Sequence, residues 1–460
     1  MSANLTKRSP AVKPAGAAIA AFLFAALAAV PALRAQDPAE PPAGRPRPRS
    51  LSPPGGAILR KDVDEGALRA TIEELVACGT RHSLSSWEDA RRGIGCGRDR
   101  IVARLADIAK TSGGRLSVSV DRFEATAPRT REKPARLENV LAFLPGSDAR
   151  LAKIVFLVSG HYDSMPSSVM DSEADAPGAD DDASGTAVSI ECARLLSKGT
   201  YRATLLFAAV SGEEQGLLGG KRLLEYLKEK GYRIGGVLNN DIVGADFATG
   251  GPHRVRVFSG GGPDGVDSPS RDLARAVEEA AGRNTVRMVF RLDRLGRGGD
   301  HRPFVEAGLP AVRFTEPLEN YDHEHQTPRV ENGREYGDLT KFLNFGFLGH
   351  VARANAETLR QLALAPAPPG DVTVSGGVTP DAKLEWSAEE DSEREGFEIL
   401  WRETTEPRWS VYDFALSAGE RALNGVSTDN HFFAVRSVGK NGARSIPVAA
   451  VLKAPPPRNR

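Results

Sequence analysis

Apolar runs that end in acidic or histidine-bearing segments recur through the middle of the chain. Residues 154–158 form a continuous apolar run and residues 203–210 a nearly continuous one, which predicts two strands buried on both faces. The segments 237–240 and 311–314 predict two more strands, and residues 186–196 and 217–230 have the pattern of helices. Strands alternating with helices predict an α/β fold, a three-layer α/β/α domain with a mixed, largely parallel sheet.

A different pattern begins after Leu364. The segment 365–369, Ala-Pro-Ala-Pro-Pro, has the composition of a hinge. Short segments of strand character follow at 372–374, 382–386, 396–402 and 431–437, with turn residues between them. We therefore expect one domain over residues 61–364 and a small all-β sandwich over residues 370–455.

The first 60 residues have the composition of an export signal and a tether. Three basic residues precede an apolar stretch at 15–33, so residues 1–35 have the pattern of a signal peptide. An uncleaved anchor is the alternative, but Pro31 and Arg34 interrupt the stretch. Residues 36–60 are rich in proline and arginine and read as an extended linker. The expectation is a secreted or periplasmic protein with no stable membrane span after the signal is cleaved.

Charge and cysteine content narrow the classes of function. The 60 basic and 60 acidic residues balance, which argues against a nucleic-acid partner. In an exported protein Cys78 and Cys96 could form a disulfide, and two buried thiols are the alternative. Cys192 falls in a predicted helix and is interpreted as a packed thiol.

Five segments carry candidate chemistry, and four of them directly follow a predicted strand or precede a predicted helix. They are SGHYDS (159–164), PGADDDASG (177–185), SGEEQG (211–216), NNDIVG (239–244) and DHEHQTP (322–328). Each has an ordinary explanation by itself, such as a solvated acidic turn, a helix N-terminus or a capping aspartate. Together they offer imidazoles and carboxylates, the ligands of a two-zinc hydrolase.

Spacing within two of these segments suggests a division of roles. Residues two apart in an extended segment point the same way, so Asp163 could accept a hydrogen bond from the second ring nitrogen of His161. In the pair Glu213-Glu214, one carboxylate could bind metal while its neighbour takes a proton from water.

The ordered set resembles the co-catalytic di-zinc aminopeptidase family of the MH peptidase clan, over roughly residues 65–360. The resemblance implies two zinc ions, His161 and Asp241 on one, Glu214 and His325 on the other, and Asp181 bridging both. It implies Glu213 as the general base and Asp163 as the carboxylate behind His161. Asp180 and Asp182 compete with Asp181, and His323 competes with His325.

One position departs from the family pattern. Some relatives carry a tyrosine just before the last ligand, where this chain has Glu324, so Tyr321 or His323 could polarise the substrate carbonyl instead. The stretch 299–304 resembles the family's Ser-Asp-His-x-Pro-Phe segment, and Asp300 and His301 are interpreted either as structural residues or as hydrogen-bonding partners of the metal ligands.

The implied function is a secreted zinc-dependent aminopeptidase that removes residues from peptide or protein N-termini. A carboxypeptidase or a glutaminyl-cyclase-like enzyme on the same scaffold is the alternative, and a catalytically silent binding ectodomain is another. A complete ligand set together with Glu213 argues against both a cyclase and a silent domain. The segments around Trp386, 397–402 and 432–436 resemble a fibronectin type III domain, which is either a spacer or a module for an extracellular or cell-surface ligand.

Overall fold

The computed structural model describes residues 55–248, 253–260, 267–377 and 379–453. The expected signal peptide and residues 36–54 of the expected linker lie outside the described residues. Within the described ranges, no helix combines the length and the apolar character needed to cross a membrane.

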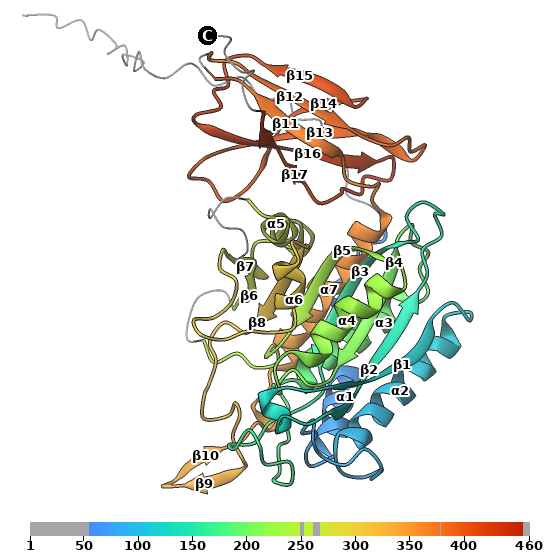
Figure 1. Ribbon diagram of the computed structural model, residues 1–460, viewed down its shortest axis with the longest axis vertical. Helices are drawn as coiled ribbons and strands as arrows, with labels where there is room; N and C mark the ends of the chain where they lie inside the picture. The colour runs from blue at the N-terminus through green and yellow to red at the C-terminus, as the bar shows by residue number, and fades with distance from the viewer. Residues whose placement is uncertain (1–54, 249–252, 261–266, 378, 454–460) are drawn as a thin grey trace, which may run out of the picture. The chain divides into compact units, whose positions relative to one another are not determined.

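An eight-stranded mixed sheet forms the centre of the described residues between 55 and 364, with the strand order β1-β2-β4-β3-β5-β8-β6-β7 (Figure 1). Its strands are β1 (Ser117–Ala125), β2 (Ala135–Leu144), β3 (Ile154–His161), β4 (Thr204–Val210), β5 (Arg233–Asn240), β6 (Val255–Phe258), β7 (Val286–Val289) and β8 (Ala311–Thr315). The four central strands β4, β3, β5 and β8 are parallel to one another, while β2 and β6 join them antiparallel. The carboxyl ends of the four central strands therefore lie along one edge of the sheet.

Helices cover both faces of this sheet, which gives the three layers. They are α1 (Glu65–Val76), α2 (Ile94–Thr111), α3 (Ala183–Leu196), α4 (Leu218–Glu229), α5 (Pro269–Ala281), α6 (Arg302–Glu306) and α7 (Phe345–Leu364), with short 3-10 turns at Arg60–Asp62, Pro128–Thr130 and Thr340–Phe342. The side chains of β3 alternate: Phe156 and Val158 join the cluster formed by α1, α2, α3, α5 and α7, whereas Val155 and Leu157 join the cluster formed by α4 and α6. This strand is buried on both faces, as its apolar run predicts.

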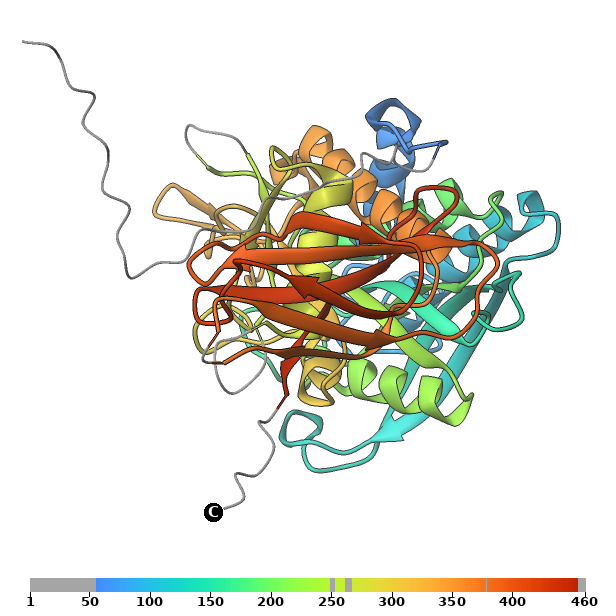
Figure 2. The same ribbon diagram turned by 90° about the horizontal axis from the view of Figure 1, so that it is seen from above.

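Residues 370–452 form two further sheets that enclose a hydrophobic core of their own. Their order is β15-β12-β11-β18 in one and β14-β13-β16-β17 in the other. The strands of both sheets are the orange to red arrows in Figure 2. The strands are β11 (Gly370–Ser375), β12 (Ala382–Ser387), β13 (Arg394–Glu403), β14 (Ser410–Ala415), β15 (Gly419–Leu423), β16 (His431–Gly439), β17 (Val448–Ala449) and β18 (Val451–Leu452). Trp386 of one sheet packs edge-on against Phe397 of the other, with ring centroids 5.8 Å apart. A two-stranded hairpin, β9 (Arg329–Glu331) and β10 (Arg334–Tyr336), follows the last candidate segment.

The three cysteines divide into a bonded pair and a single thiol. Cys78 and Cys96 form a disulfide that joins the turn after α1 to the first turn of α2. Cys192 is a buried free thiol in α3. Of the two alternatives for Cys78 and Cys96, the structure contains the disulfide.

Candidate metal centre

The candidate residues meet at the carboxyl edge of the parallel strands. His161 ends β3, Glu213 and Glu214 follow β4, and Asp241 follows β5. These three strands are neighbours in the order β4-β3-β5, so the side chains that follow them gather at one place. The turn that precedes α3 brings Asp181 to the same place.

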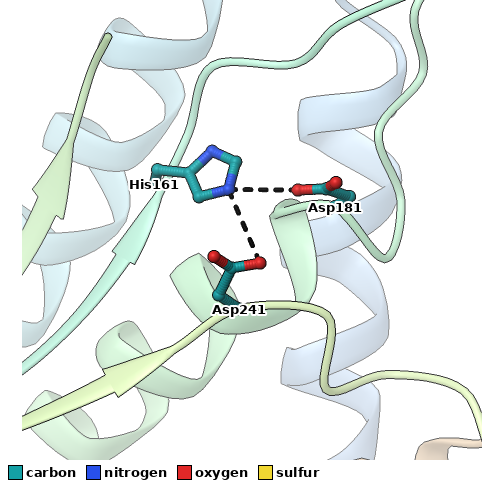
Figure 3. Close-up of side chains that lie close together, drawn as sticks. All are labelled: His161, Asp181 and Asp241. Atoms are coloured by element: carbon teal, nitrogen blue, oxygen red, sulfur yellow. Dashed lines mark ion pairs between the residues drawn. The ribbon is translucent and has the colours of Figure 1, made fainter. Parts of the chain in front are cut away.

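One group of side chains combines His161, Asp181 and Asp241, all of them buried (Figure 3). The Nε2 atom of His161 lies 3.0 Å from Oδ1 of Asp181 and 3.9 Å from Oδ1 of Asp241. In Figure 3 the two carboxylates face the same ring nitrogen. One nitrogen and two carboxylate oxygens thus converge on a single point.

A second group combines Asp181 with Glu214 and His325. The Nε2 atom of His325 lies 2.8 Å from Oδ2 of Asp181 and 3.0 Å from Oε1 of Glu214. Asp181 therefore presents one oxygen to each group. The side chain of His325 is 34% exposed, so this half of the centre is open to solvent while the other half is closed.

The contacts fit bound cations better than hydrogen bonds alone. Although His325 Nε2 lies 3.0 Å from Oε1 of Glu214, that buried oxygen accepts a hydrogen bond from none of the described residues. Ligand atoms bound 2.0–2.2 Å from one tetrahedral ion lie roughly 3.4 Å apart, close to the separations seen here. Imidazole nitrogens with carboxylate oxygens form a donor set that zinc accepts.

In each of the two groups, the carboxylates raise the pKa of the histidine. Burial lowers the pKa of His161, but contacts with Asp163, Asp181 and Asp241 outweigh burial and raise that pKa well above its usual range. Burial also lowers the pKa of His325, but the carboxylates of Glu214 and Asp181 outweigh burial and raise that pKa to about 12. The carboxylates thus make both positions favourable for positive charge.

The three adjacent aspartates have separate partners. Asp182 caps α3 by accepting from the amide of Gly185 at 2.9 Å, and it also accepts from the amide of His161 at 2.9 Å. Asp180 accepts from the amides of Gly244 at 2.6 Å and Ala245 at 3.1 Å. Of the three, Asp181 is the member whose carboxylate belongs to both groups.

Asp163 lies behind His161 and also anchors the glutamate turn. The Nδ1 atom of His161 is 3.1 Å from the main-chain oxygen of Asp163 and 3.5 Å from its Oδ1. The carboxylate of Asp163 also accepts from the amides of Glu213 and Glu214 and from the hydroxyl of Ser83. Either contact to Nδ1 leaves Nε2 of His161 free to bind a cation.

Glu213 lies beside these groups without belonging to either. Its side chain is partly exposed, unlike that of Glu214. Burial and the carboxylates of Asp241 and Glu214 raise the pKa of Glu213 well above its usual range, and His161 opposes this rise. A carboxylate in such surroundings has an increased tendency to take up a proton.

The two histidines of the segment 322–328, His323 and His325, have different surroundings. His323 stacks on Phe342 with ring centroids 3.7 Å apart and meets Phe247 edge-on, so it is packed among aromatic rings. Tyr321 is 65% exposed, while Glu324 is buried. His301 is also buried, and its Nε2 atom lies 2.8 Å from the main-chain oxygen of Leu292.

Two residues that support the centre, Arg313 and Asp338, were not among the candidates predicted from the sequence. Arg313 of β8 donates to Oδ1 of Asp241 at 2.6 Å. Asp338 accepts from the amides of Asp180 and Asp181 at 2.8 and 2.7 Å, and so holds the turn that carries the shared carboxylate. Neither has a local signal in the sequence beyond its residue type, because both act through contacts with distant segments.

Comparisons with known proteins agree with this geometry. The model of Peptidase family M28 matches residues 139–341. A probable zinc metalloprotease of Leptosphaeria maculans is 40% identical over 408 residues, covering 84% of this chain and 94% of that protein. One of Pyricularia oryzae is 40% identical over 415 residues, covering 84% of this chain and 82% of that protein.

The fold has a counterpart among solved structures. The crystal structure of the Legionella pneumophila LapA aminopeptidase superposes with a TM-score of 0.50 at 18% identity, over 67% of this chain and 74% of that chain. This similarity concerns the arrangement of the sheet and helices.

Proposed function

The chain belongs to peptidase family M28, and from this premise we propose that it is a secreted zinc-dependent aminopeptidase. It would bind two zinc ions and hydrolyse N-terminal residues from peptides. The observation that carries the proposal is the shared carboxylate: Asp181 directs Oδ1 toward His161 and Oδ2 toward His325. A carboxylate between two ligand groups is what a two-metal hydrolytic site requires.

The ligands divide into two sets in this proposal. His161 and Asp241 would hold one zinc ion, Glu214 and His325 the other, and Asp181 both. Zinc is supported by the nitrogen and oxygen donors and by relatives named probable zinc metalloproteases. Bound there, zinc would supply Lewis-acid chemistry that makes water acidic and polarises a peptide carbonyl.

Glu213 would act as the general base. Its carboxylate would take the proton of the attacking water and then donate that proton to the leaving amine. Asp163 would keep His161 oriented through Nδ1 and would hold the turn that carries Glu213. Both roles use contacts that exist in the folded chain.

The charge of the centre supports exopeptidase chemistry at an N-terminus. Asp181, Asp241, Glu213 and Glu214 gather carboxylates around the point where the peptide bond would be cleaved. A free substrate α-ammonium group would be attracted to these carboxylates.

Export and domain organisation belong to the same proposal. The disulfide between Cys78 and Cys96 supports an oxidising compartment, in line with the signal peptide expected at residues 1–35. A peptidase domain over 61–364 and a fibronectin type III-like domain over 370–455 are supported by the separate hydrophobic core of the two C-terminal sheets.

The test measures metal content and turnover on aminoacyl chromogenic substrates for the wild-type chain and Glu213→Ala. We expect two zinc ions per chain in both proteins and loss of turnover by at least about 100-fold in the variant, since general-base catalysis contributes 10²–10⁴-fold. Glu225→Ala, which removes an exposed glutamate of α4, is the matched control and should keep full activity.

Peptides with an acetylated N-terminus separate the alternatives. An aminopeptidase should leave them intact, because the acetyl group removes the positive charge. Cleavage of these peptides from the C-terminal end would instead establish a carboxypeptidase, and a chain without bound metal would refute the catalytic proposal.

A further inference from the structure

Arg313 is a buried arginine that touches one of the proposed zinc ligands. Its side chain is 1% exposed, and Nη2 donates to Oδ1 of Asp241 at 2.6 Å. The same Oδ1 atom faces Nε2 of His161 at 3.9 Å. We propose that Arg313 is a positioning residue that orients Asp241 and so strengthens cation binding at the His161–Asp181–Asp241 group alone.

The sheet itself brings this arginine to the centre. Strands β8 and β5 pair in parallel, with Arg313 opposite Asn239 and Phe314 opposite Asn240, and Asp241 follows directly. The guanidinium lies close to the backbone of Gly299, where a Cβ atom would stand 2.7 Å from Nη1. A glycine at this position therefore leaves room for the arginine.

The other end of the guanidinium is held independently of Asp241. Nη1 of Arg313 donates to Oδ2 of Asp293 at 3.2 Å and to the main-chain oxygen of Gly298. Asp293 is fixed in turn because it accepts from the amide of Arg294 at 2.6 Å. Arg313 thus has partners at both Nη atoms, Asp293 and Gly298 at Nη1 and Asp241 at Nη2, and would align the Asp241 carboxylate before any cation binds.

The two halves of the centre differ in this respect. Asp241 has a charged hydrogen-bond donor behind it, whereas Oε1 of Glu214 accepts a hydrogen bond from none of the residues that the structure describes. Outer partners that hydrogen-bond a metal ligand typically change metal affinity by 10–100-fold when they are removed. Loss of Arg313 should therefore weaken the binding of the cation held by Asp241 and leave the binding of the other cation unchanged.

This inference rests on the proposed two-zinc function, and the experiment separates the two. Zinc affinity is measured by competition with a chromophoric chelator on the full chain, for the wild type, Arg313→Met and Arg313→Lys. Cobalt absorption spectra report the two positions separately. Arg287→Met, an exposed arginine of the same sheet, is the matched control.

We expect the wild type and Arg287→Met each to bind two ions. The affinity for each ion should be the same in the two proteins. In Arg313→Met, one ion should bind roughly 10–100-fold more weakly and the other unchanged. Arg313→Lys keeps the charge but cannot reach Asp241 and Asp293 together, so its loss should be smaller than that of Arg313→Met. If Arg313→Met does not fold, the site-selective loss in Arg313→Lys decides.

Two results would overturn the inference while the proposed function stands: wild-type affinity for both ions in the Arg313 variants, or an equal loss at both positions. A wild-type chain that binds no zinc would overturn the proposed function and this inference with it.

Discussion

Asp180, Asp181 and Asp182 are neighbours in the sequence, but their carboxylates face different partners. Asp180 accepts from the amides of the segment after β5, and Asp182 caps α3. Only Asp181 of the three belongs to both candidate ligand groups. At the residue scale, the chemistry depends on which way each carboxylate points, a property that residue type does not reveal.

His301 allows a test of buried charge next to the centre. Burial lowers its pKa to about 4, and Asp293 opposes this shift only in part. The folded chain therefore keeps His301 neutral while the unfolded chain protonates it near pH 6.5. The contribution of neutral His301 to the unfolding free energy is complete above pH 6.5 and is lost as the pH falls toward 4.

We expect the unfolding free energy of the wild type to fall between pH 7.5 and pH 5 by about 2 kcal/mol more than that of His301→Gln. The glutamine of this variant cannot titrate. Denaturant unfolding of both proteins at the two pH values measures the difference. An equal pH dependence in the two proteins would mean that His301 is not kept neutral by the fold.

At the scale of elements, the close approach of β3 to α3 places His161 beside the turn that carries Asp181. Gly160 makes this approach possible. A Cβ atom there would lie 2.3 Å from the carbonyl carbon of Gly185 and 2.4 Å from the amide nitrogen of Thr186. Both are backbone atoms of the helix start, so a side chain could be accommodated only by moving α3.

We expect Gly160→Ala to lower the unfolding free energy by about 3 kcal/mol, the upper part of the usual range for overpacking. Gly55→Ala is the control, because nothing lies within 4 Å of a Cβ at that position. Denaturant titration compares the two variants with the wild type. Equal stability of Gly160→Ala and the wild type would show that the β3–α3 contact can relax.

At the scale of the whole molecule, the disulfide restricts the unfolded chain. It links cysteines 18 positions apart, and closing a loop of this size contributes about 3 kcal/mol in the chain-entropy model. Replacing both Cys78 and Cys96 by alanine should lower the unfolding free energy by about this amount. Denaturant unfolding of the double variant and of the reduced wild type measures it.

Thiol counting provides the check on that prediction. The unfolded, unreduced wild type should present one reactive thiol, that of Cys192, because Cys78 and Cys96 are bonded. Three reactive thiols would contradict the disulfide. A wild type whose stability is insensitive to reductant would contradict its energetic role.

Local patterns in the sequence determined the main elements of the peptidase sheet. The apolar runs correctly predicted β3, β4, β5 and β8, and the helical segments correctly predicted α3 and α4. The four strands and α3 are largely buried and α4 buries one face, so their apolar positions carry a strong signal. The apolar patterns of the sequence did not predict β1 and β2. Strand β1 has no buried residue, which weakens its apolar pattern.

The residue types at the strand ends also followed from the sequence, because the demand for imidazoles and carboxylates is chemical and local. Only the tertiary structure decided how they combine. Asp181, rather than its neighbours, meets His161 and His325, and His323 packs against Phe342 instead. The contact of Arg313 with Asp241 depends on the pairing of β8 with β5. Such contacts join segments far apart in the chain, and their distances exist only once the sheet has formed.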